Sequence, residues 1–267
     1  MPLIVFAHAN SFPASTYGVL FEQLRTRGYT VVALEKFGHD PRYPVSDNWP
    51  QLVAQLADFA RAEVAAFGER AFLVGHSLGG YLSLMCAAQY PELARGVLLL
   101  DAPLVGGWRA AGLRLGKRTK LLRRFSPAMV SHQRRNRWPD LAAVYGHFHA
   151  KKMFRRWDQQ TLHNYVNFGT HDEGGQRALS FDRDVESHIY NTIADNIDEW
   201  LRCYPLHCKA GFVGGVHSRE MGQVGMSTVS RVVGSRIAML DGGHLFPMEK
   251  PHQTAAAMDA MLRQLDA

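Results

Sequence analysis

The chain has 267 residues, enough to bury one large core or to form one catalytic domain that carries an insertion. Hydrophobic residues make up 46% and charged residues 20% of the sequence, ordinary values for a globular protein, and no apolar run is long enough to cross a membrane. The formal net charge of +6 is modest for the chain as a whole, so its distribution matters more than its size.

The N-terminal residues and the cysteines bear on the cellular compartment. Residues 1–7 lead directly into an apolar strand and lack the basic start and the length of a secretory signal, so no signal peptide is expected. The three cysteines are an odd number without a repeated spacing, which favours free thiols in a reducing compartment. We therefore expect a cytoplasmic protein, and no metal site, because Cys203, His207 and Cys208 lack a fourth ligand at a suitable spacing.

The first part of the chain alternates apolar runs with amphipathic ones. Leu3–Ala7 is predicted as a strand, followed by a loop with the sequence HANSFP and by a helix over residues 16–27. Residues 29–34 form the next predicted strand. Residues 48–67 repeat apolar side chains at helical spacing, which predicts a helix with one buried face (Val53, Leu56, Ala60 and Val64).

A strand, a tight turn and a helix follow at residues 71–90. Between the apolar strand and the helix lies the sequence GHSLG at residues 75–79, which fits the nucleophile elbow Gly-x-Ser-x-Gly. Ser77 would occupy a strained turn where side chains two residues before or after it would collide with their neighbours, and glycine removes both. The helix that begins there would direct its N-terminal N–H groups and its dipole at a reacting carbonyl.

This strand, elbow and helix resemble the α/β-hydrolase superfamily. The resemblance implies that the loop after the first strand supplies part of an oxyanion hole, although Ala9 stands where the family has glycine. By position, the backbone N–H groups of Asn10 and Leu78 are the pair expected to hold an oxyanion.

Further apolar strands complete the predicted sheet. Residues 96–100 form a strand that ends in Asp101, and residues 209–213 and 236–240 form two more before a closing helix over residues 251–265. Strands that are apolar throughout and separated by helices favour a parallel sheet covered on both faces. The family normally has two further strands at the start, so we predict an α/β fold with a doubly wound, mostly parallel sheet of about six strands, truncated at its N-terminal side. The strand at residues 29–34 should lie at one edge.

The pattern changes between residues 104 and 206, where apolar spacing suggests several helices and no convincing buried strand. Length and position resemble the cap that many family members insert after this strand, and such caps shape the substrate entrance and exclude water. The expected organisation is a core in two parts, residues 1–103 and 207–267, with a helical cap at 104–206.

His244 follows the last predicted strand, in a Gly-His pair that resembles the family's catalytic-histidine loop. A serine nucleophile needs such a base, and the base needs a carboxylate to fix its tautomer and stabilise the imidazolium. In most family members the acid follows the penultimate strand, where this chain offers only Glu220. Some lipases and the haloalkane dehalogenases carry it instead at the position of Asp101. We expect Ser77, His244 and Asp101 to be the catalytic set, with Glu220 as the alternative acid and the absence of any functional acid as a third outcome.

Basic residues are concentrated in the predicted cap. Residues 109–137 contain ten and no acidic residue, and four more follow at 151–156. Either this is a solvated helix face, or it attracts an anionic substrate or surface, such as a coenzyme A thioester, an ester bearing a carboxylate, or acidic lipid headgroups. Nucleic acid is not expected, because no aromatic platforms alternate with the bases. The ten residues are Arg109, Arg114, Lys117, Arg118, Lys120, Arg123, Arg124, Arg134, Arg135 and Arg137.

The sequence therefore predicts a serine hydrolase acting on a small-molecule carboxylic ester or thioester, without a metal or an organic cofactor. A serine at position 77 argues against haloalkane dehalogenase and epoxide hydrolase chemistry, which need an aspartate nucleophile. A carbon–carbon bond hydrolase on the same residues and a non-catalytic ligand-binding member of the fold are the alternatives. Phe12, His76 and Trp108 are candidates for substrate contact, and the sequence does not fix the oligomeric state.

Overall fold

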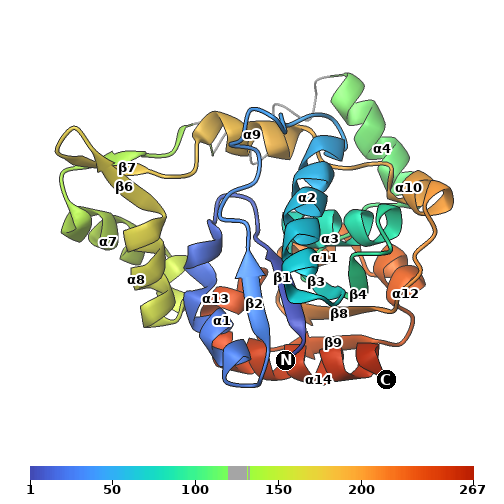
Figure 1. Cartoon of the computed structure of the whole chain (residues 1–267). Helices are drawn as coiled ribbons and strands as arrows, with labels where there is room; N and C mark the ends of the chain where they lie inside the picture. Colours follow the sequence, from blue (N-terminus) through green and yellow to red (C-terminus); the bar gives the residue numbers. More distant parts are fainter. Residues whose placement is uncertain (120–130, 132) are drawn as a thin grey trace.

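The computed structural model describes residues 1–119, 131 and 133–267 (Figure 1). Its centre is a six-stranded sheet with the order β2-β1-β3-β4-β8-β9, in which every neighbouring pair is parallel. The predicted parallel sheet of about six strands, with the second strand at one edge, is confirmed. Its strands are β1 (Leu3–Ala7), β2 (Thr30–Ala33), β3 (Ala71–His76), β4 (Ala94–Leu100), β8 (Ala210–Gly215) and β9 (Ile237–Leu240).

Helices cover both faces of this sheet because alternate strand residues point to opposite sides. In β1, Leu3 and Val5 pack in the cluster formed with α2 and α3, whereas Ile4 and Phe6 pack in the cluster formed with α1 and α14. The helices of the core are η1 (Ala14–Tyr17), α1 (Gly18–Arg25), α2 (Pro50–Phe67), α3 (Leu78–Gln89), α11 (Arg219–Val224), α12 (Ser227–Val233), α13 (Phe246–Glu249) and α14 (Pro251–Asp266).

The strand register brings the loops that carry the candidate site together. His76 pairs with Leu100, so β3 and β4 end side by side and the residues that follow them are neighbours. Gly215 pairs with Leu240 in the same way at the ends of β8 and β9. Ligands of open parallel sheets bind beyond these carboxyl ends.

Residues 104–206, which we call the insertion, lie between β4 and β8. Part of the insertion projects to one side of the sheet, and α9 crosses above the end where the strands finish (Figure 1). Besides helices, it contains a three-stranded antiparallel sheet with the order β5-β7-β6. The elements are α4 (Gly107–Arg118), β5 (Arg137–Trp138), α7 (Leu141–His149), η2 (Phe154–Arg156), α8 (Gln159–Phe168), β6 (Thr170–Glu173), β7 (Gln176–Leu179), α9 (Arg183–Asn191) and α10 (Ile197–Cys203).

These three short strands add to the several helices expected in the insertion, for which no convincing buried strand is predicted. The strands have two to four residues, and in β6 only Thr170 is buried, so no apolar run marks them in the sequence. Leu121 and Leu122, which contribute to the apolar spacing that predicts helices between residues 104 and 206, lie outside the described residues. Within the described part of the chain, no helix combines the length and apolarity needed to span a membrane.

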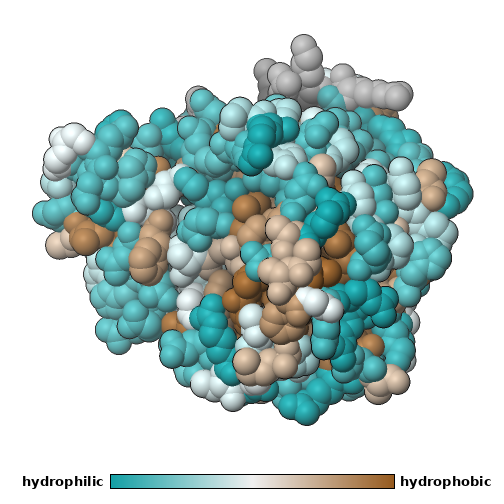
Figure 2. Space-filling view, viewed as in Figure 1, coloured by the Kyte–Doolittle hydropathy of each residue, from teal (hydrophilic) through white to brown (hydrophobic). Residues whose placement is uncertain are grey.

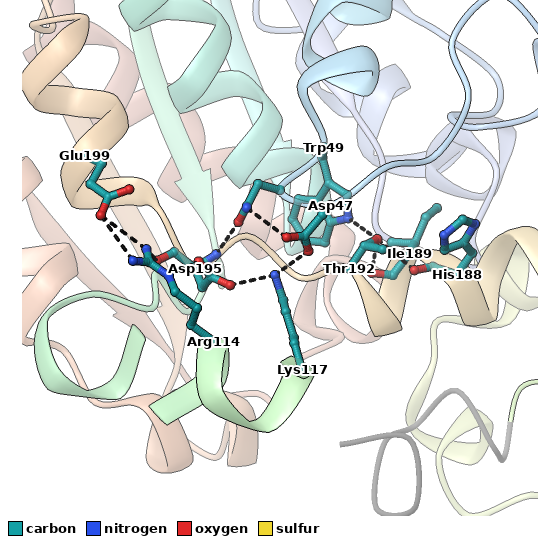
Figure 3. Close-up of polar contacts among 10 residues, drawn as sticks. Asp47, Trp49, Arg114, Lys117, His188, Ile189, Thr192, Asp195 and Glu199 are labelled. Atoms are coloured by element: carbon teal, nitrogen blue, oxygen red, sulfur yellow. Dashed lines mark hydrogen bonds and ion pairs between the residues drawn. The ribbon is translucent and has the colours of Figure 1, made fainter. Parts of the chain in front are cut away.

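An ion-pair network fixes the start of the insertion to the core (Figure 3). The buried carboxylate of Asp195 accepts from Arg114 Nε at 3.0 Å and lies 2.7 Å from Lys117 Nζ, both on α4. Lys117 also pairs with Asp47 in the loop before α2, and Arg114 with Glu199 on α10. Two of the ten clustered basic residues are therefore neutralised by structural partners.

The face seen in Figure 1 is mainly hydrophilic (Figure 2). More hydrophobic residues gather near its centre, where β2 forms the edge of the sheet. The side chains of β2 are only partly buried except for Val31, as expected of an edge strand.

Candidate active site

Ser77 lies in the turn between β3 and α3 with φ 54° and ψ −114°, a backbone conformation that is unfavourable for any residue with a side chain. The turn is held by the Ser77 N–H, which donates to the Leu100 carbonyl at 3.0 Å. A Cβ atom on Gly75 would lie 2.0 Å from the backbone of Gly79, and one on Gly79 would lie 2.0 Å from the carbonyl oxygen of Ala7. Both glycines are therefore required by close backbone approach.

Ser77, His244 and Asp101 form a hydrogen-bonded line. Ser77 Oγ lies 3.0 Å from His244 Nε2, and His244 Nδ1 lies 2.6 Å from Asp101 Oδ2. The three residues follow β3, β9 and β4, whose carboxyl ends share one edge of the sheet. This arrangement can deliver a serine oxygen as a nucleophile while the imidazole takes its proton.

Asp101 is fully buried and is surrounded by donors. Its Oδ1 accepts from the Gly215 N–H at 2.7 Å, and its Oδ2 accepts from Ser218 Oγ at 2.5 Å as well as from His244. The alternative acid, Glu220, places its Oε2 4.0 Å from His244 Nδ1, beyond hydrogen-bond distance, and its side chain is 47% exposed. The carboxylate that contacts the imidazole is thus the one after β4.

The sequence does not reveal Ser218 as a site residue, because only an acidic residue is expected in this loop. Its Oγ donates to Asp101 and also accepts from the Met221 N–H, which caps α11. A serine three residues before an N–H at a helix start is a recognisable N-cap signal. The contact with Asp101 spans 117 positions, however, and no local pattern predicts it.

The two predicted oxyanion-hole groups lie where α3 and the loop after β1 begin. Leu78 is the first residue of α3, so its N–H has no partner within the helix. Asn10 belongs to the loop after β1 and contributes to the lining of the cavity that contains Ser77. Among the described residues, neither N–H donates to a protein acceptor, so both remain available to a ligand oxygen.

His76 connects the oxyanion loop to the histidine loop. Burial lowers the pKa of His76 well below its usual value, so the ring is neutral. Its Nε2 lies 2.8 Å from the His244 carbonyl, which only accepts, so Nε2 carries the proton and Nδ1 accepts from Tyr17 Oη at 2.8 Å. Tyr17 Oη in turn accepts from the Ala9 N–H at 3.1 Å. The chain of bonds therefore runs from Ala9 to His244.

Ser77 and His244 open into a cavity of about 880 Å³ between the core and the insertion. Phe12 lies in its lining, as predicted for a substrate contact. His76 is fully buried outside the lining, and Trp108 is 78% exposed on α4 and also outside it. Their placement does not support the predicted substrate contacts of His76 and Trp108. Apolar lining from the insertion and the histidine loop comes from Phe148, Met153, Phe154 and Leu245.

Glu186 is a buried carboxylate in the cavity wall that the sequence analysis did not identify. From α9, its Oε1 accepts from Ser11 Oγ at 2.5 Å and Ser131 Oγ at 2.8 Å, and its Oε2 lies 2.7 Å from Arg134 Nη2. Its backbone carbonyl accepts from Asn10 Nδ2 at 3.1 Å. Ser11 has φ 79°, a strained value that these contacts help to maintain. The insertion thus holds the loop that carries the candidate oxyanion group.

Seven of the ten basic residues predicted to face an anionic ligand fall into three groups. Lys120, Arg123 and Arg124 lie outside the described residues. Arg114 and Lys117 belong to the network that fixes α4. Arg134 and Arg135 line the cavity, where Lys151, Lys152 and Arg156 from the later basic group join them. Among the described residues, no group of three or more metal-ligating side chains is placed to hold a metal ion.

Comparisons with known proteins agree with this fold. A family model described as "Alpha/beta hydrolase family" matches residues 4–257. A 2-(acetamidomethylene)succinate hydrolase of Mesorhizobium japonicum is 30% identical over 106 residues, 38% of this chain, and the match spans 35% of that protein, about a third of its length.

Solved structures extend the likeness over the whole chain. A crystal structure of E-2-(acetamidomethylene)succinate hydrolase has a TM-score of 0.73 at 20% identity and covers 98% of this chain and 91% of its own. The thioesterase domain from the curacin biosynthetic pathway has a TM-score of 0.73 at 17% identity, with coverages of 98% and 91%. A thermophilic esterase from Thermogutta terrifontis, solved with malate bound, has a TM-score of 0.65 at 17% identity, with coverages of 100% and 91%.

Proposed function

Because the chain belongs to the alpha/beta hydrolase family, we propose that it is a serine hydrolase that cleaves a carboxylic ester or thioester through an acyl-enzyme. The observation that carries the proposal is the line from Ser77 Oγ through the His244 ring to the Asp101 carboxylate, with distances of 3.0 and 2.6 Å. Relatives of similar fold that are named as an esterase and a thioesterase support the same class of reaction.

In the proposed reaction, Ser77 Oγ attacks the carbonyl carbon while His244 Nε2 takes its proton. Asp101 stabilises the imidazolium and keeps the His244 Nδ1 proton in place. The N–H groups of Asn10 and Leu78 hold the oxyanion of the tetrahedral intermediate. His244 then protonates the leaving alcohol or thiol, and water, activated by the same ring, releases the acid.

The insertion is proposed to act as a cap over this reaction. It supplies Phe148 and Phe154 to the cavity wall and Glu186 to the loop that carries Asn10. A cap of this kind excludes water, which strengthens the interactions of the oxyanion with its donors. The cytoplasmic location expected from the cysteines remains part of this proposal.

The alternatives from the sequence differ in their support. The reason for a non-catalytic role is that the usual acid position lacks a carboxylate, and the Asp101 carboxylate 2.6 Å from His244 weakens that reason. Cleavage of a carbon–carbon bond in a diketone would use the same three residues, and only substrates separate it from ester hydrolysis.

Reaction with a fluorophosphonate probe tests the proposal directly. We expect one adduct on the native protein, none on Ser77→Ala, and unchanged labelling on Ser230→Ala, whose exposed serine lies on α12. Hydrolysis of 4-nitrophenyl butyrate and of S-butyryl-N-acetylcysteamine should be lost in the same Ser77 variant. Labelling that persists in Ser77→Ala, or native protein that neither labels nor hydrolyses either compound, would overturn the proposed function.

A further inference from the structure

Positive charge is concentrated around the mouth of the cavity that contains Ser77. Three carboxylates line the cavity (Glu186, Glu220 and Glu249), against six basic side chains (Arg134, Arg135, Lys151, Lys152, Arg156 and Arg219). The lining therefore has an excess of cations before any substrate binds.

Internal ion pairs account for only two of the six cations. Arg134 pairs with Glu186 at 2.7 Å, and Arg156 pairs with Glu249 at 3.1 Å. The third carboxylate, Glu220, is half exposed and lies nearest the His244 ring.

The remaining four cations, Arg135, Lys151, Lys152 and Arg219, form no ion pair with a carboxylate of the described residues. The residues between 119 and 133 that are not described contain no aspartate or glutamate, so they supply no carboxylate either. Four positive charges without a carboxylate partner thus line the cavity that contains the candidate nucleophile.

One of the four cations, Lys151, is held in its charged form at a cost. Its pKa is lowered by partial burial and by the positive charge of Arg134. Its ammonium lies 5.3 Å from the centre of the Phe148 ring, at the boundary between the charged mouth and the apolar wall. An anion bound here would favour the charged form of Lys151 and relieve the repulsion between the two cations.

The cations that fix α4 show the opposite arrangement. Arg114 and Lys117 share the buried carboxylate of Asp195, and each has a second carboxylate partner (Figure 3). The cations that fix α4 therefore have carboxylate partners, whereas Arg135, Lys151, Lys152 and Arg219 line the cavity without one among the described residues.

We propose that the substrate carries a negatively charged group, a carboxylate or a phosphate, which the cations of Lys151, Lys152, Arg135 and Arg219 bind at the mouth of the cavity. This inference rests on the proposed function, since it assigns the substrate class of the same site. The apolar wall formed by Phe12, Phe148 and Phe154 would take the uncharged part. Uncompensated cations in a cleft also raise the rate at which an anion arrives.

Two matched pairs of substrates test whether the protein prefers an anionic substrate, and whether the charge lies on the acyl group or on the leaving group. Mono-(4-nitrophenyl) succinate and 4-nitrophenyl butyrate differ by a carboxylate on the acyl group. Butyryl-coenzyme A and S-butyryl-N-acetylcysteamine share the acyl group and the thioester, and differ by phosphates on the leaving group. We expect kcat/KM to favour the anionic member of at least one pair about tenfold at low salt. The preference should fall severalfold in 0.5 M NaCl, where charges are screened within about 4 Å, while the neutral members change little.

Charge-removing variants locate the effect on the protein. Lys151→Gln/Lys152→Gln should raise KM for the favoured anionic substrate about fivefold, from about two- to threefold for each exposed cation. KM for the neutral partner should change by less than this factor, so that the preference for the anionic substrate falls. The matched control is Arg70→Gln/Lys209→Gln, which removes the same charge from exposed positions just before β3 and β8, at the opposite end of the sheet. This control should leave both KM values unchanged.

The outcomes separate this inference from the proposed function. Hydrolysis of the neutral esters by Ser77 with no preference for either anion, or equal effects of the two double variants, would overturn the inference and leave the hydrolase intact. If Ser77 proves unreactive, calorimetry with both pairs of compounds on Ser77→Ala still decides it. Tighter binding of the anionic member of either pair, weakened by the lysine substitutions, supports the site, and equal binding within both pairs refutes it.

Discussion

Replacing Asp101 by asparagine is the sharpest test of how the candidate site works. The carboxylate accepts from Gly215 N–H at 2.7 Å, from Ser218 Oγ at 2.5 Å and from His244 Nδ1 at 2.6 Å. An asparagine has the same shape but only one accepting atom, and it brings two donor hydrogens. The site surrounds both oxygens with donors, so neither orientation of the amide satisfies it.

The two orientations have different consequences. With the amide nitrogen at the Oδ1 position, a donor faces the buried Gly215 N–H, which costs about 1 to 3 kcal/mol of stability. With the nitrogen at the Oδ2 position, His244 Nδ1 must accept, so its proton moves to Nε2 and the ring can no longer take the proton of Ser77. The corresponding substitution in a Ser-His-Asp protease lowers kcat by about 10⁴, equivalent to about 5.5 kcal/mol of transition-state stabilisation. We expect a loss of about 10³ to 10⁴ for Asp101→Asn.

Glu220→Gln is the matched control, because it makes the same chemical change on the other candidate acid. At 4.0 Å from His244 Nδ1 and 47% exposed, Glu220 should contribute no more than about twofold. The assay is kcat for 4-nitrophenyl butyrate at pH 8, with circular dichroism to show that each variant is folded. An Asp101→Asn protein that keeps a tenth of its activity, or a Glu220→Gln protein that loses a hundredfold, would refute the reasoning.

Three further predictions follow from buried contacts. Glu186→Gln should lower kcat about tenfold with little change in KM, because the loop carrying Asn10 loses its charge-assisted contact; a change in KM alone would contradict this positioning role. Gly79→Ala should prevent folding, because the added Cβ would lie 2.0 Å from the carbonyl oxygen of Ala7. In the control Gly112→Ala, on α4, the added Cβ has no neighbour within 4 Å, so the free energy of unfolding in urea should be unchanged or rise by up to about 1 kcal/mol. Equal effects of the two substitutions would count against the packing argument. Burial lowers the pKa of His8 to about 4, so between pH 6.5 and 4 the unfolded state binds more protons than the folded state. The free energy of unfolding should therefore fall by about 3 kcal/mol as the pH drops through that range. Urea midpoints that stay constant across the range would refute a buried, neutral His8.

The sequence predicts the sheet and the candidate nucleophile because both are encoded locally. Continuous apolar strands and two glycines around Ser77 need no information from elsewhere in the chain. His244 is similarly marked by its place after the last strand. Asp101 directly follows the strand at residues 94–100, and the pairing of this strand with residues 71–76 brings Asp101 close to the turn that carries Ser77.

The supporting residues could not be predicted because their roles arise from contacts between distant segments. Ser218 meets Asp101 across 117 positions, and Glu186 meets Ser11 across 175. Tyr17 reads as an ordinary core aromatic until the structure places its hydroxyl between Ala9 N–H and His76. Composition likewise cannot distinguish basic residues that are paired within the fold, such as Lys117, from those that are left facing the cavity.

The candidate catalytic residues and three of the unpaired cations lie on different parts of the chain, which has a consequence for engineering and for divergence. In the proposed reaction, the groups that attack, transfer the proton and support the imidazole lie in turns at the carboxyl ends of β3, β4 and β9. Arg135, Lys151 and Lys152, in contrast, all belong to the insertion. With the anion site proposed above, surface substitutions in the insertion would shift substrate preference toward neutral or differently charged acyl groups, while the candidate catalytic residues stay unchanged. A library randomised at those three positions would sample new substrate preferences without changing the candidate nucleophile, Ser77.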